Sequence, residues 1–512
     1  MCKQVFTAIL FLIGILNLES QSINQNVDQW YNQNEHSIVS KYFEFLSIPN
    51  TYNDKDDLSK NALFIENLLK SAGVATQLLN NKDQTAIPVV YGEVLALGAD
   101  KTIIFYAHYD GQPVNPTQWA TGLEPFTPVF ITDRVDLGGK KIDFPEIGQR
   151  FNPEWRIYGR SSADDKAGVY TIIEAYRYIR NAGIKPNVNI KFFFEGEEER
   201  GSINLESILE HHKEKLRSDM WVICDGPMPA SGKKQITYGV RGDINVYMTI
   251  FGAKRPLHSG NYGNWAPNPA HKMARLLASM KDDEGKVLID GFYDDVIPLS
   301  EEERNALNKI EDPGAMMQGE LGFAASETVG KTFLECITSM PTLNINGMSA
   351  ANTGKLAGNI IPATASAVLD LRLVKGNTVQ GQVTRLKKHI EKMGYKIIEN
   401  EPTDEERKQY SNLIYFAMKD GYPAQRTSMS HPTAKVIADA LQKSVYDGEL
   451  IQMPSSGGSL PLYLFEKVLQ TSPVTIPIVN YDNNQHAENE NLKLSCLKEG
   501  IKSLTSVMMN AK

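Results

Sequence analysis

Hydrophobic residues in the first half of the chain recur with two different periods. Between residues 58 and 72 they return every three or four positions and Gly73 follows, which predicts an amphipathic helix. Later runs are continuously apolar, as in strands buried on both faces, and helical patterns separate them. The apolar runs lie at residues 102–107, 188–194 and 221–224. The helical patterns between them lie at residues 168–179 and 205–216. Strands that alternate with helices predict an α/β fold, a mostly parallel sheet with helices on both faces.

The pattern changes near residue 240. Residues 243–251 and 365–373 alternate between apolar and polar side chains, which is typical of strands with one solvated face. A continuously apolar strand returns only at residues 474–479. We therefore expect an inserted α+β domain, a lid and dimerisation domain, within the α/β catalytic domain. The expected boundaries are 23–239 and 406–512 for the two parts of the catalytic domain and 240–405 for the insertion.

The first 22 residues have the pattern of a secretory signal peptide. Lys3 precedes an apolar run from Val5 to Leu16, and a polar stretch with small residues follows. The run is shorter than the roughly 20 residues that cross a bilayer as a helix. An N-terminal helix that packs on the core remains the alternative. We expect an exported protein, periplasmic or secreted, that has no contact with the membrane once residues 1–22 are removed.

The composition is that of a globular protein. Of the 512 residues 42% are hydrophobic and 22% charged. The 61 acidic and 53 basic residues give a net charge of −8, which argues against a nucleic-acid backbone as the partner. Beyond the expected signal, Cys224, Cys336 and Cys496 are odd in number and far apart, so free thiols are favoured over a disulfide framework.

Acidic and histidine residues follow the predicted strands. In open parallel sheets the functional crevice lies at the carboxyl ends of the strands, so these residues should meet at one edge. Each alone has an ordinary alternative: a hydrogen-bonded core histidine, a helix N-cap or a solvated acidic run. Together they place like charges side by side, which repel unless a cation compensates. The residues are His108, Asp110, Asp164, Glu198, Glu199, Asp225 and His486.

This set is too large for one catalytic zinc ion. Such an ion takes three protein ligands, whereas two histidines and three carboxylates suffice for two ions if one carboxylate bridges them. Two ions can share a water molecule and lower its pKa. A further carboxylate must stay off the metals as the proton shuttle, and the acidic run 197–199 supplies one beside a ligand. We expect two divalent ions, with zinc preferred and manganese or cobalt as alternatives.

Three segments resemble motifs of a known family, and the resemblance spans about residues 40–505. His108-Tyr-Asp110 matches its H-x-D segment, residues 158–166 look like G-R-G-x-x-D-x-K-G, and residues 195–202 are similar to E-G-x-E-E-x-G-S. The family includes acetylornithine deacetylase, succinyl-diaminopimelate desuccinylase, carboxypeptidase G and carnosinase-like dipeptidases, which are dinuclear zinc metallopeptidases.

The resemblance implies a role for each residue of the set. Asp164 would bridge the two ions, Glu198 would be the general base, and Asp110 would orient His108. One ion would be held by His108, Asp164 and Asp225, and the other by Asp164, Glu199 and His486.

Further matches concern the substrate. His258 resembles the histidine that reaches a neighbouring active site, which implies a homodimer with shared sites. Arg372 and Asn359 look like groups that hold the substrate carboxylate, and His431 and Ser459 match pocket segments. The alternatives are a turn residue for His258, a surface ion pair for Arg372 and a helix-start residue for His431.

The chain also departs from the family pattern. Ser161 and Ala167 stand where the motif has glycine, and Ser455 and Ser456 stand where relatives often carry Arg-Glu. The metal site and base are intact, so these changes bear on specificity. We expect metal-dependent hydrolysis of small peptides, as in a dipeptidase. The alternatives are an N-acyl-amino-acid deacylase, a secreted aminopeptidase or carboxypeptidase with the same metal centre, and a non-enzymatic, receptor-like relative, which the intact ligands disfavour.

Overall fold

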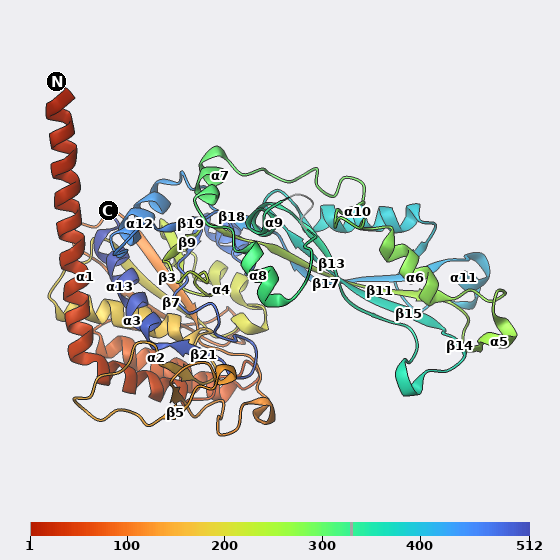
Figure 1. The fold of residues 1–512 in the computed structure, drawn as a ribbon, viewed down its shortest axis with the longest axis horizontal. Helices are drawn as coiled ribbons and strands as arrows, with labels where there is room; N and C mark the ends of the chain where they lie inside the picture. The colour runs from red at the N-terminus through yellow and green to blue at the C-terminus, as the bar shows by residue number, and fades with distance from the viewer. Residues whose placement is uncertain (1, 328–330) are drawn as a thin grey trace. The chain divides into compact units, whose positions relative to one another are not determined.

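The computed structural model describes residues 2–327 and 331–512. The chain forms two compact units (Figure 1). The first contains residues 1–238, 427–453 and 464–512, and the second contains residues 239–426 and 454–463. The insertion thus ends later than the expected residue 405, because β17 (Leu413–Tyr422) pairs with β11 (Gly242–Phe251) inside the second unit. Residues 454–463 also belong to the second unit, whereas the expected boundaries place them in the catalytic domain.

An eight-stranded sheet forms the centre of the first unit. β7, β3, β8 and β20 run parallel to one another, and the pair β1–β2 adds an antiparallel edge. This arrangement confirms the expected fold class. The strands in spatial order are β1 (Ala75–Leu79), β2 (Val89–Val94), β7 (Asn189–Glu195), β3 (Thr102–His108), β8 (Met220–Ile223), β20 (Pro473–Thr475), β9 (Gln235–Thr237) and β19 (Ile451–Met453).

Alternate residues of β7 pack against different helical layers. Phe192 contacts Tyr176 of α3, whereas Phe193 contacts Trp221, which packs against Phe465 beside α4. Both faces of the sheet are therefore covered, which is why its strands are apolar without alternation. The helices of this unit are α1 (Cys2–Leu46), α2 (Lys55–Ser71), α3 (Lys166–Asn181), α4 (Leu205–His211), α12 (Pro432–Gln442) and α13 (Leu494–Asn510).

A smaller antiparallel sheet lies beside the metal-ligand candidates. Its strands are β21 (Asn491–Lys493), β6 (Arg156–Tyr158), β4 (Val129–Ile131) and β5 (Lys141–Ile142), in that spatial order. β6 leads into the segment that carries Asp164, and β21 follows the segment that carries His486. Pairing of β6 with β21 therefore brings two segments together that are over three hundred positions apart in the sequence.

The second unit has a five-stranded sheet, ordered β13 (Thr342–Ser349), β15 (Thr364–Leu373), β11, β17 and β16 (Lys396–Ile398). Residues of β11 are buried alternately, as the sequence pattern predicts. The buried face shares one hydrophobic core with α6 (Pro269–Ala278) and α10 (Val379–Lys392). The remaining elements are β10 (Gly239–Val240), β12 (Leu257–His258), α5 (Ser259–Tyr262), α7 (Glu301–Asn308), α8 (Gly314–Leu321), α9 (Phe333–Ser339), β14 (Ile360–Ile361), α11 (Asp404–Gln409) and β18 (Gln425–Arg426).

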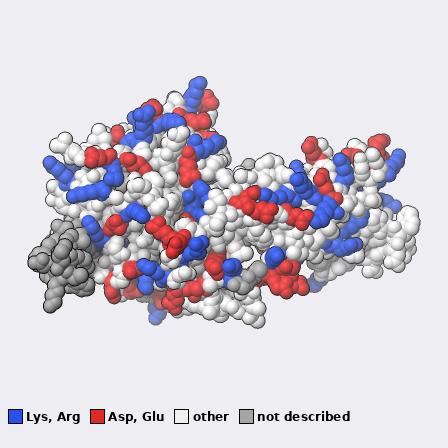
Figure 2. Space-filling model, turned by 90° about the horizontal axis from the view of Figure 1, so that it is seen from above, with Lys and Arg blue, Asp and Glu red and all other residues white. Residues whose placement is uncertain are grey.

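The expected signal peptide lies within α1, which runs from Cys2 to Leu46 without interruption. Among the described residues, no helix combines the length and apolarity needed to cross a bilayer. Removal of residues 1–22 stays a prediction. Within the described part of the chain, Cys224, Cys336 and Cys496 take part in no disulfide. Basic and acidic side chains are interspersed on the face that Figure 2 shows.

Candidate metal centre

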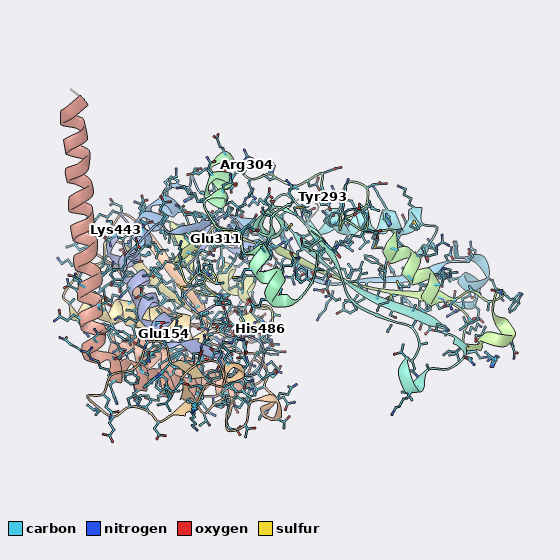
Figure 3. All side chains as sticks on the ribbon, in the orientation of Figure 1. Glu154, Tyr293, Arg304, Glu311, Lys443 and His486 are labelled. Carbon is cyan, nitrogen blue, oxygen red and sulfur yellow. The ribbon has the colours of Figure 1, made fainter. Side chains whose placement is uncertain are left out.

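The parallel strands of the first unit deliver three of the candidate ligands to one edge. β3 ends at His108, and β7 ends in register with it at Glu195, four residues before Glu199. β8 is followed within two residues by Asp225. Asp164 comes from the turn before α3, and His486 lies in the loop before β21 (Figure 3). The helix starts after Asp165, whose carboxylate accepts from the Gly168 N–H and caps it.

The carboxylate of Asp164 serves two groups of side chains. Its Oδ1 lies 3.0 Å from Nε2 of His108, and its Oδ2 lies 3.0 Å from Nε2 of His486. Nε2 of His108 is also 3.8 Å from Oδ2 of Asp225, and Nε2 of His486 is 3.3 Å from Oε2 of Glu199. In each group the ligand atoms lie within 4.8 Å of one another. The two groups are His108, Asp164 and Asp225, and Asp164, Glu199 and His486.

These distances fit a pair of divalent ions. Ligand atoms about 2.1 Å from a tetrahedral ion lie about 3.4 Å apart, which is within the observed range. The donor set of imidazole and carboxylate is the one that zinc and similar ions bind. A carboxylate with one oxygen in each group has the geometry that a bridging ligand needs. The structure thus brings together all five expected ligands.

Asp110 organises the two segments that carry the neighbouring candidates. Its carboxylate accepts hydrogen bonds from the backbone N–H groups of Glu198 (3.1 Å) and Glu199 (3.0 Å). One oxygen also lies 3.3 Å from Nδ1 of His108, and the backbone carbonyl of Asp110 lies 3.1 Å from the same atom. These contacts hold the imidazole so that Nε2 faces the other ligands.

Glu198 lies beside the two groups without belonging to either. Its Oε2 is 3.7 Å from Nε2 of His108. Burial raises the pKa of Glu198 well above its usual range, and the charges of Asp225 and Glu199 raise it further. A carboxyl group of high proton affinity next to two candidate metal sites is placed to accept and return a proton.

The ligand carboxylates repel one another in the metal-free protein. Burial, and then the charge of Asp164, raises the pKa of Glu199 to about 8 and that of Asp225 to about 6. A hydrogen bond to Asp164 raises the pKa of His486 to about 9. The cluster therefore retains protons that a bound cation would displace.

Two residues that the sequence analysis did not single out hold these segments in place. Asn50 donates through Nδ2 to the carbonyl of Tyr109 (2.8 Å) and to Oγ of Ser161 (2.9 Å). The buried carboxylate of Glu490 accepts hydrogen bonds from the segment that ends at Asp164. Neither residue belongs to a periodic pattern, and the only sequence signal is the position of Glu490 four residues after His486.

Two of the expected substrate residues meet in the second unit. Nη1 of Arg372 donates to Oγ of Ser459 over 2.8 Å. Nε of Arg372 also lies 3.1 Å from Asp370 and 3.6 Å from Asp243, which faces it across the β11–β15 pair. Arg372 therefore makes ion pairs, as the alternative to a substrate-binding role predicts. These ion pairs hold its guanidinium next to the hydroxyl of Ser459.

His258 and Asn359 lie together at the opposite end of the same sheet. The carbonyl of Asn359 accepts from the N–H of Ser259, and β12 pairs with β14 next to both residues. This ribbon continues the β11–β15 pair beyond Thr364, and the eight residue steps from Thr364 to Arg372 alone span about 26 Å. The structure therefore separates Asn359 from Arg372 within one chain.

His431 belongs to the first unit, at the start of α12. Pro432 follows it at the first helical position, and the His431 side chain does not cap the helix. Its buried Nδ1 has no hydrogen-bond partner among the residues that the structure describes. A role of His431 in substrate binding stays a prediction.

Comparison with known proteins places these observations in context. Residues 104–510 match the family described as Peptidase family M20/M25/M40. The human Beta-Ala-His dipeptidase is 27% identical over 435 residues, which cover 83% of this chain and 78% of the relative. The Saccharomyces cerevisiae Cys-Gly metallodipeptidase DUG1 is 27% identical over 445 residues, 85% of this chain and 84% of the relative.

Solved structures show the same fold. An M20 family metallo-carboxypeptidase, Sso-CP2 from Sulfolobus solfataricus, superposes with a TM-score of 0.73 at 29% identity, covering 93% of this chain and 99% of the other. Human carnosine dipeptidase 1 superposes with a TM-score of 0.69 at 22% identity, covering 95% and 99%.

Proposed function

Because the chain belongs to peptidase family M20/M25/M40 and is thus a hydrolase of peptide bonds, we propose that it cleaves dipeptides and similarly small peptides. The observation that carries this proposal is the Asp164 carboxylate, which places one oxygen in each of two ligand groups. The dipeptidases among its relatives support the substrate size. We propose zinc as the resident metal, since both ligand groups combine imidazole and carboxylate.

The residues of the first unit have the arrangement that metal-assisted hydrolysis requires. Two divalent ions held by the two ligand groups would lower the pKa of water and polarise the substrate carbonyl. Glu198 would take the proton from the attacking water and return it to the leaving nitrogen. Asp110 would hold the His108 side chain and the backbone of Glu198 in fixed positions during the reaction, because its carboxylate contacts both.

The active site is completed, in this proposal, by a second copy of the chain. Arg372 and Ser459 lie at one end of the second unit's sheet, whereas His258 and Asn359 lie at the other. Two copies can supply both pairs to one substrate although a single chain separates them. β13 is an edge strand, and its residues 344–349 are exposed, including Ile345 and Met348. Such an edge favours pairing with another strand across a two-fold axis.

Complementation tests the shared site. His258→Ala removes a donor that can stabilise the developing oxyanion, and Glu198→Ala removes the base, so each homodimer should be nearly inactive. After full subunit exchange, half of the dimers are mixed and each mixed dimer has one intact site, so about a quarter of wild-type activity should return. An exchanged mixture that stays inactive, or an active monomer in sedimentation, would rule out shared sites.

A second candidate function is release of an amino acid from an N-acyl conjugate. Ser455 and Ser456, which depart from the family pattern that the sequence resembles, precede the glycine pair of the Ser459 segment. Hydroxyl groups there offer no carboxylate to pair with the free amino group of a dipeptide. A screen of dipeptides, N-acetyl amino acids and aminoacyl amides with added zinc, manganese or cobalt separates the two functions. Preferential cleavage of N-acetyl amino acids would replace the dipeptidase proposal.

Export of the mature protein is a further proposal, and residues 1–22 support it. N-terminal sequencing of the protein recovered outside the cytoplasm should show a new terminus close to residue 22. An intact Met1 in that fraction would contradict signal removal.

A further inference from the structure

The carboxylate of Glu490 is fully buried and accepts four hydrogen bonds from one short segment. Oε2 accepts from Nη1 of Arg160 (2.7 Å) and from the N–H of Ser161 (2.9 Å). Oε1 accepts from the N–H groups of Ala163 and Asp164, both at 2.9 Å. Each carboxylate oxygen of Glu490 thus accepts two hydrogen bonds from the segment 160–164.

We propose that Glu490 is a positioning residue that fixes the segment of Asp164 against the segment of His486. The inference rests on the proposed function, since it concerns the residues that would hold the two ions. Glu490 touches no substrate in this role, and its effect on the reaction passes through Asp164.

Chain connectivity makes the carboxylate a link between the two ligand groups. His486 lies only four residues before Glu490, and Gln485 donates through Nε2 to Oδ2 of Asp164 over 3.2 Å. The backbone carbonyl of Glu490 accepts from the N–H of Gly159, next to the pairing of β21 with β6. The position of His486 relative to Asp164 therefore depends on the contacts that Glu490 makes.

Both linked segments hold residues in backbone conformations that L-amino acids rarely adopt. Ser161 has a φ of 58° and His486 a φ of 64°, both in the left-handed region. Such conformations persist only where surrounding contacts hold them. The hydrogen bond from the Ser161 N–H to Glu490 is one of these contacts, and Asn50 supplies another through Oγ of Ser161.

The consequence concerns metal affinity. Asp164 places one oxygen in each ligand group, so a displacement of its segment disturbs both groups at once. Residues that orient metal ligands typically change metal affinity by about 10- to 100-fold when they are replaced. We expect a loss of this size for the pair of zinc ions when the four hydrogen bonds are weakened.

Glu490→Gln tests the inference because it keeps the shape of the side chain. The amide NH2 replaces one acceptor oxygen and faces two N–H donors whichever way it is turned: Ala163 and Asp164, or Ser161 and the Arg160 guanidinium. The matched control is Glu174→Gln. Glu174 is also buried, lies in the middle of α3 and accepts a hydrogen bond from Nε of Arg177 over 2.9 Å. Zinc affinity is measured by competition with a chelator, and stability by thermal unfolding of the metal-free proteins.

The expected result is zinc binding about 10- to 100-fold weaker in Glu490→Gln than in Glu174→Gln at comparable unfolding temperatures. Glu490→Asp, which keeps the charge but is one methylene shorter, should also bind zinc more weakly. Wild-type zinc affinity in Glu490→Gln, or a parallel loss in both glutamine variants, would overturn the inference and leave the proposed function intact. A wild-type protein that binds no zinc would overturn both.

Discussion

Binding of two divalent ions should displace about three protons from the ligands at pH 7. A hydrogen bond to Asp164 raises the pKa of His486 to about 9, and burial with the charge of Asp164 raises that of Glu199 to about 8. Burial opposes protonation of His108, but hydrogen bonds to carboxylates raise its pKa well above the usual range. Each of these groups must lose its proton before it can bind a metal ion.

The number of protons follows from these pKa values. At pH 7 His108, His486 and Glu199 each carry nearly one proton in the metal-free protein. Asp225, with a pKa of about 6, carries little, and hydrogen bonds to both histidines hold the pKa of Asp164 low although burial opposes them. The product of the two binding constants should therefore rise about 10³-fold per pH unit near pH 7. The increase per pH unit should become smaller above about pH 8, where Glu199 loses its proton, and smaller again above about pH 9, where His486 does.

Calorimetry measures this release directly. Metal is titrated into the metal-free protein at one pH in buffers of different ionisation enthalpy, and the slope of observed heat against ionisation enthalpy gives the protons released. Glu199→Gln lacks one titrating ligand and should release about two protons at pH 7 instead of about three.

Two results would refute the reasoning. Release of fewer than one proton at pH 7 would mean that the ligands are already ionised side by side, so that burial and mutual repulsion do not hold protons there. A release that increases between pH 7 and 9 would contradict the direction of the shifts.

Three substitutions extend the test. Glu198→Gln should lower turnover by about 10²–10⁴-fold while metal analysis still finds both ions, and loss of metal with activity would make Glu198 a ligand. Asp164→Ala should abolish activity and leave fewer than two ions bound, whereas two bound ions with normal turnover would contradict a bridging carboxylate. Arg372→Ala should raise KM for substrates with a free carboxylate and spare those with a blocked one, and an equal effect on both would assign Arg372 to the ion pairs of its sheet.

The arrangement of the ligands could be predicted from the sequence because it follows from a general property of parallel sheets. Apolar runs without alternation mark buried strands, and their carboxyl ends meet at one edge. The sequence alone therefore predicts that His108 and Asp225 lie in one place. His486 was expected at the same edge, because it follows the apolar run 474–479, whereas its assignment to one particular ion came only from the resemblance.

Other features depend on contacts that leave no pattern in the sequence. Residues 413–422 look like any half-buried strand, and only their pairing with β11 shows that the second unit extends to residue 426. Glu490 lies in a stretch of polar residues, where an acidic side chain usually faces solvent. Its burial follows from the pairing of β21 with β6, which no local signal predicts.

The ligand set spans the chain from His108 to His486, and α13 packs against α3 near the centre of the first unit. A growing polypeptide therefore lacks one complete ligand group until residue 486 has been synthesised. Incomplete chains, from interrupted synthesis or from cleavage before His486, cannot assemble both groups and should be inert. The order of the ligands along the chain thus restricts the complete metal centre to molecules that contain every residue from His108 to His486.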